Sequence, residues 1–112
     1  MEQNIKVSKT VNDTVEGTIR KVLSAIKDLG LELKNVDSKN GIIRFEKYTF
    51  VGRLQYSYQC AIFDLGDGST MCSIQTVGYN EEENFIAAQK LDRLNLLGHN
   101  SRKHSQKILD RL

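Results

Sequence analysis

His99 and His104 are the only histidines in this sequence, and histidine is the side chain that acts as a base near neutral pH without a shifted pKa. Nucleophilic catalysis would also need a serine or cysteine beside that base and a third group that orients it. Ser101 and Ser105 are close in sequence but form no recognisable motif with either histidine, and Ser105 falls on the apolar stripe of the last predicted helix. We therefore expect solvated or helix-capping histidines in a protein that is not an enzyme and needs no cofactor.

Two other short motifs are superficially similar to ion-binding sites. Glu81–Glu83 offers three carboxylates, but consecutive helical residues fan out around the axis and make a poor cation cage. Gly66–Ser69 contains two glycines, but a phosphate loop is followed by a helix, whereas a strand is predicted to follow here. The first motif indicates a helix start, where carboxylates suit the helix dipole, and the second indicates a hairpin turn. We expect no metal site.

The two cysteines, Cys60 and Cys72, lie on the two arms of a predicted hairpin and are positioned to face each other across it. Two thiols without histidines at suitable spacing do not complete a zinc site. In a reducing compartment such residues pack as small buried side chains. We therefore predict two free thiols, with a redox pair as the alternative.

Basic residues are concentrated toward the C-terminus, where six lysines and arginines and two aspartates follow Asn84. Lys103, Lys107 and Arg111 have the i, i+4, i+8 spacing of one helix face and are candidates to contact a phosphate or an acidic partner. Such a face is also compatible with simple solvation. The net charge of only +2 gives no separate argument for nucleic acid or a membrane surface. Nucleic acid is therefore an alternative partner on the strength of the basic helix face alone, and a membrane is not expected.

Leucines give a second candidate for partner binding. A predicted helix from about Asn84 to Leu97 carries apolar residues around too much of its circumference to bury them all on one sheet face, Leu91, Leu94 and Leu97 among them. The apolar residues that do not face the sheet are expected to pack against another segment of the chain or a partner. Residues 101–112 can fold back over them after a turn at Gly98, or they can reach a second subunit. We expect one of these, and favour a homodimer.

A β-hairpin is the clearest structural prediction. Alternating apolar and polar residues on both sides of a glycine-rich turn indicate two antiparallel strands between Leu54 and Val77, with one buried face. The buried face shares one parity, which places Tyr56 and Tyr58 in the core rather than on an exposed stacking platform. The residues predicted to point inward are Leu54, Tyr56, Tyr58, Cys60, Ile62, Cys72 and Ile74.

The remaining elements are predicted from periodicity and turn residues. A strand near residues 4–11 precedes a helix over about residues 14–29, started by Asp13 at capping-box spacing from Glu16 and ended by Gly30. Strands follow over 31–34 and 42–48, joined by a turn that ends in Asn-Gly, and a connection over 49–53 leads to the hairpin. A helix from about Asn80 to Leu97 is interrupted at residues 98–101, and a last helix runs to Leu112.

This order predicts one α+β domain over residues 1–112, with a five-stranded antiparallel sheet and helices on one face. It resembles in topology alone the small β-α-β4-α folds known from the TATA-box-binding protein, and in outline the helix-grip ligand-binding domains. No family motif accompanies the resemblance, so it transfers no functional residues. The polar start of the chain predicts no signal peptide and a cytoplasmic location. We expect a small binding domain that self-associates, holds a small apolar ligand between sheet and helix, or binds an acidic partner.

Overall fold

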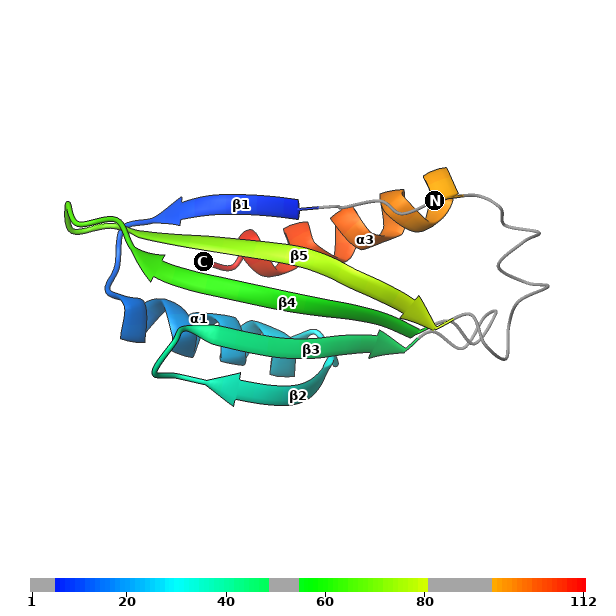
Figure 1. Ribbon diagram of the computed structural model, residues 1–112, viewed down its shortest axis with the longest axis horizontal. Coiled ribbons are helices and arrows are strands. Elements are labelled where there is room, and N and C mark those ends of the chain that lie inside the picture. Colours follow the sequence, from blue (N-terminus) through cyan, green and yellow to red (C-terminus); the bar gives the residue numbers. More distant parts are fainter. Residues whose placement is uncertain (1–5, 49–54, 81–93) are drawn as a thin grey trace.

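The computed structural model describes residues 6–48, 55–80 and 94–112, of which 55, 78–80 and 94–101 are described by their backbone only (Figure 1). Its five strands form one antiparallel sheet in the order β1-β5-β4-β3-β2, and both helices lie behind that sheet in Figure 1. The predicted α+β class and element order are confirmed. The elements are β1 (Lys6–Val11), α1 (Val15–Asp28), β2 (Glu32–Asp37), β3 (Ile42–Tyr48), β4 (Gln55–Asp64), β5 (Thr70–Asn80) and α3 (Leu94–Leu109).

The core lies between the sheet and the two helices, and the predicted inward face of the hairpin supplies much of it. Tyr56, Tyr58, Cys60, Ile62, Cys72 and Ile74 are all buried, which confirms the predicted parity; Leu54 lies outside the described residues. Ile43 and Phe45 continue this face on β3, and Phe45 stacks on Tyr58 with ring centroids 5.1 Å apart. Strand register is therefore set by burial, because a slip of one residue would bury the polar face instead.

The two cysteines meet inside this core. Cys60 is paired with Ile74 and Ile62 with Cys72, so the thiols are diagonal neighbours on adjacent strands. Their sulfur atoms are 3.4 Å apart and both cysteines are free, as predicted. The hydrogen bond to Cys72 and burial raise the pKa of the Cys60 thiol, so it stays protonated at neutral pH.

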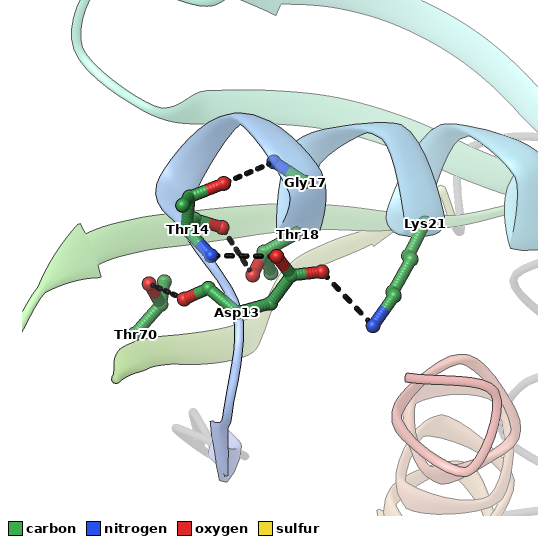
Figure 2. Close-up of polar contacts among 6 residues, drawn as sticks. All are labelled: Asp13, Thr14, Gly17, Thr18, Lys21 and Thr70. Carbon is green, nitrogen blue, oxygen red and sulfur yellow. Dashed lines mark hydrogen bonds and ion pairs between the residues drawn. The ribbon is translucent and has the colours of Figure 1, made fainter. Parts of the chain in front are cut away.

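Helix α1 begins one residue later than its capping-box pattern indicates. Thr14 has an extended backbone and its Oγ1 accepts the Gly17 amide at 3.0 Å, so Thr14 and not Asp13 is the N-cap (Figure 2). The Asp13 carboxylate instead accepts the Thr14 amide and lies 3.0 Å from Lys21 Nζ, while its backbone oxygen accepts Thr70 Oγ1. Asp13 thus joins the helix start to β5. The predicted end at Gly30 is confirmed, with a φ of 72°.

The predicted break in the last helix is wrong. Helix α3 continues through residues 98–101, because one glycine costs a helix only about 1 kcal/mol and no proline intervenes. Ser105, Ile108 and Leu109 are fully buried in this chain's own core and hold the helix to it. Residues 101–109 therefore continue the helix that contains Leu94 and Leu97 and do not fold back over it.

Some predicted features differ or lie beyond the described ranges. Asn80, predicted to cap a helix, is the last residue of β5, where it pairs with Gln55. The predicted connection over 49–53, the helix start at 81–83 and Leu91 lie outside the described residues. Neither helix in the described ranges combines the length and apolarity that a membrane crossing requires.

Candidate anion-binding groove between the first strand and the last helix

Three cationic side chains converge where α3 passes beside β1. Arg102, Lys103 and Lys107 line a surface groove of about 490 Å³ together with Gln106, Asp110 and Val7. The side chains from α3 are all exposed, and Val7 on β1 is half-buried. Three positive charges face one carboxylate here, so the groove favours an anionic ligand.

The helical repeat of about 3.6 residues explains why these side chains of α3 face away from the core. Ser105, Ile108 and Leu109 point into the core, so residues 102, 103, 106, 107 and 110 lie on the remaining, outer arc of α3. On β1, Val7 shares the parity of Val11, which is buried, and therefore lies on the helix side of the sheet. The groove is thus formed by the outer arc of α3 and the helix-facing side of an edge strand.

Lys9 fixes the two walls of the groove to each other. Its Nζ donates to the backbone oxygen of Leu109 at 3.1 Å, although the two residues are 100 positions apart. The last carbonyl groups of a helix have no partner within the helix, and a cation there also complements the helix dipole. This contact holds the C-terminal end of α3 against β1.

The structure separates the three predicted basic residues. Lys103 and Lys107 both line the groove, but Arg111 lies beyond the end of α3 and its Nη1 is 3.3 Å from Asp28 Oδ2 on α1. The predicted single basic face is therefore wrong for Arg111, because the helix ends at Leu109. Leu94 and Leu97 are helical residues of α3, but the structure describes only their backbone.

Sequence reasoning counted Arg102 in the basic C-terminal segment but not on the predicted helix face, and it did not place Gln106 or Val7 in the site. Arg102 and Gln106 have i, i+4 spacing, which was a usable signal for one helical surface. Val7 had no such signal, because it reaches the groove only through the packing of β1 beside α3.

His104 lies at the sheet side of α3 and is not the solvated histidine that was predicted. Its Nδ1 is hydrogen-bonded to the Tyr58 hydroxyl at 2.5 Å, and its ring meets Tyr56 edge-on with centroids 4.9 Å apart. Burial, reinforced by the charges of Lys47, Lys107 and Lys103, lowers its pKa to about 4. His104 is therefore neutral at physiological pH and ties α3 to β4, while His99 lies in the backbone-only part of α3.

The opposite, open face of the sheet also carries a cavity, of about 470 Å³, but its charged groups already have partners. Arg44 Nε donates to Gln59 Oε1 at 3.1 Å, and Lys34 Nζ lies 3.9 Å from Glu46 Oε1. Ser57 donates to the other oxygen of the same glutamate. These internal pairs leave the face less suited to an anion than the groove.

Within the described ranges, no group of three histidine, cysteine, aspartate or glutamate side chains is arranged to hold a metal ion. Comparison with known proteins gives no assignment either, since neither a family model nor a curated protein matches this chain. The arguments for function therefore rest on the geometry of the groove.

Proposed function

We propose that this protein is a non-enzymatic binding domain that holds an acidic segment of a partner protein in the groove between β1 and α3. The observation that carries the proposal is the convergence of Arg102, Lys103 and Lys107 on one exposed groove. The anchoring of α3 by Lys9 supports it, because a fixed surface loses less entropy on binding.

An acidic polypeptide fits this groove better than a nucleic acid. Asp110 lies among the cations and would repel a continuous run of phosphates, whereas a peptide spaces its carboxylates and tolerates a local negative charge. Val7 adds an apolar contact that a polypeptide side chain can use. The small excess of positive charge over the whole chain, +2, also favours a local contact over broad polyanion binding.

An apolar ligand between sheet and helix is less well supported. Phe45, Tyr56 and Tyr58 are each about 1% exposed and fill the described part of that interface. A ligand there would have to displace aromatic packing among these rings, which is costly.

Fluorescence anisotropy with a labelled glutamate-rich peptide tests the proposal. Lys103→Ala combined with Lys107→Ala should weaken binding about tenfold at low salt, since each exposed ion pair contributes up to ~1 kcal/mol. The matched control is Lys27→Ala with Lys39→Ala, which removes the same charge at two exposed positions on α1 and the β2–β3 turn. Equal weakening by both double variants would contradict binding of the peptide in the groove. Tighter binding of single-stranded DNA than of the peptide would support the nucleic-acid alternative instead.

A further inference from the structure

We infer that the acidic partner binds as an extended segment that adds to the sheet at the outer edge of β1; this inference rests on the proposed function. In the described part of the chain β1 is an edge strand, paired with β5 on one side only. Its register runs without a shift over six residues, from Lys6 opposite Gln75 to Val11 opposite Thr70. Such an edge presents a regular row of backbone donors and acceptors to another strand.

The opposite edge is less suited to receive a strand. β2 carries a register shift between Leu33 and Asn35, and a bulge of this kind disrupts the ladder and twists the edge away. Lys34, at the shift, is also engaged with Glu32 and Glu46. Of the two edges in the described sheet, β1 therefore offers the regular backbone array.

The groove extends this edge on the helix side. A strand added to β1 would lie about 4.8 Å from it, with alternate side chains on each side of the sheet. Those on the helix side would be directed toward the outer arc of α3, where Arg102, Lys103 and Lys107 lie. Figure 1 shows α3 crossing obliquely behind the side of the sheet formed by β1 and β5. The chemistry of the occupant follows: acidic residues at the alternate positions that face the helix side.

A second copy of this chain is a poorer occupant of the same edge. Antiparallel pairing of β1 with β1 of another copy about the middle of the strand would bring Lys9, and the cations of the two grooves, toward their own equivalents. Like charges opposite each other destabilise a strand pair. An acidic segment makes the same backbone bonds and neutralises these charges.

The test uses a labelled, end-blocked eight-residue peptide of alternating glutamate and valine, measured against the full chain. Two further peptides carry N-methyl groups on either the odd or the even backbone amides, which keeps every charge but removes the donors along one edge. One methylated peptide should bind more than about tenfold more weakly and the other almost as well as the parent, because only one edge of an added strand is bonded.

Hydrogen exchange gives an independent measurement. Outward-facing amides of β1 should exchange fast in the free protein and become protected when the parent peptide is added. Equal binding of all three peptides, reduced by the Lys103→Ala and Lys107→Ala pair, would overturn the added strand and leave the proposed function standing. Binding of none would contradict both. Protection of these amides without peptide, in a dimer that the peptide does not dissociate, would assign the edge to a second copy and overturn the inference.

Discussion

His104 shows how a single side chain can connect the last helix to the sheet. It is neutral because its half-buried ring lies against Tyr56 and Tyr58 and because Lys47, Lys103 and Lys107 disfavour a further positive charge. The same lysines contribute to the positive field around the groove. One of the two histidines that the sequence offered as a candidate base is thus a packing residue with a polar contact.

The lowered pKa of His104 predicts a pH dependence of stability. The unfolded chain binds a proton near pH 6.5 and the folded chain only near pH 4, so stability should fall as the pH falls from about 6.5 toward 4. Solvent screening of a half-buried ring limits the loss to about 1–2 kcal/mol by pH 4.5. Urea unfolding at pH 7 and pH 4.5 measures the total change. Because aspartates and glutamates already begin to bind protons near pH 4.5, the difference between the natural protein and the His104→Gln variant isolates the part due to His104. His104→Gln should flatten this dependence; an unchanged slope in that variant would contradict the assignment.

Thr14 gives a second prediction at this scale. Thr14→Ala should cost about 1 kcal/mol, since the Gly17 amide loses its acceptor, while Thr14→Ser should behave like the natural protein. Asp13→Asn should have the smaller effect, because the Asp13 carboxylate does not cap the helix and its ion pair with the exposed Lys21 contributes little. Thermal unfolding ranks the three variants. A larger loss for Asp13→Asn than for Thr14→Ala would restore Asp13 as the cap.

At the scale of elements, Gly41 controls how the β2–β3 turn meets β4. Its φ is +69°, a Cβ there would come within 2.1 Å of the Ile62 backbone oxygen, and its own oxygen accepts the Ile62 amide at 2.8 Å. Gly41→Ala should therefore cost more than about 3 kcal/mol, from strain and a backbone clash together. Gly30→Ala is the matched control, with a φ of +72° and open space, and should cost about 1 kcal/mol. Similar losses at the two positions would rule out the clash.

The continuity of α3 makes an opposite prediction for another glycine. Gly98 lies within the helical backbone, so Gly98→Ala should raise helix content and stabilise the protein by about 1 kcal/mol. The interrupted helix expected from the sequence predicts the reverse, because alanine is strained at a left-handed turn position. Circular dichroism and thermal unfolding of the single variant distinguish the two. Destabilisation would favour a break.

At the scale of the whole molecule, one core holds the sheet to both helices, and the thiols lie at its centre. Cys60 and Cys72 are fully buried, so neither is reachable in the folded state. We expect almost no reaction of the folded protein with a thiol reagent over minutes at pH 8, because the reactive species is an accessible thiolate. Unfolding without reductant should then release two thiols per chain. A count of zero after unfolding would show a disulfide.

Local patterns in the sequence determined much of this fold. Period-two alternation and turn residues were enough to define β3 from Ile42 to Tyr48, the buried face of the hairpin, and the end of α1 at Gly30, because each depends on neighbouring residues. The same is true of the two buried cysteines. These features would be found in any fold that buries the same faces.

Only the tertiary structure decided where the candidate site lies. Val7 and Arg102 are 95 positions apart and meet because β1 pairs at the sheet edge beside α3. Three further features depend on which elements pack together. They are the continuation of α3 through Gly98, the ion pair of Arg111 with Asp28, and the hydrogen bond of His104 to Tyr58. Sequence periodicity specifies which face of an element is buried, but not which distant element covers it, since that choice is made by the packing of the whole core.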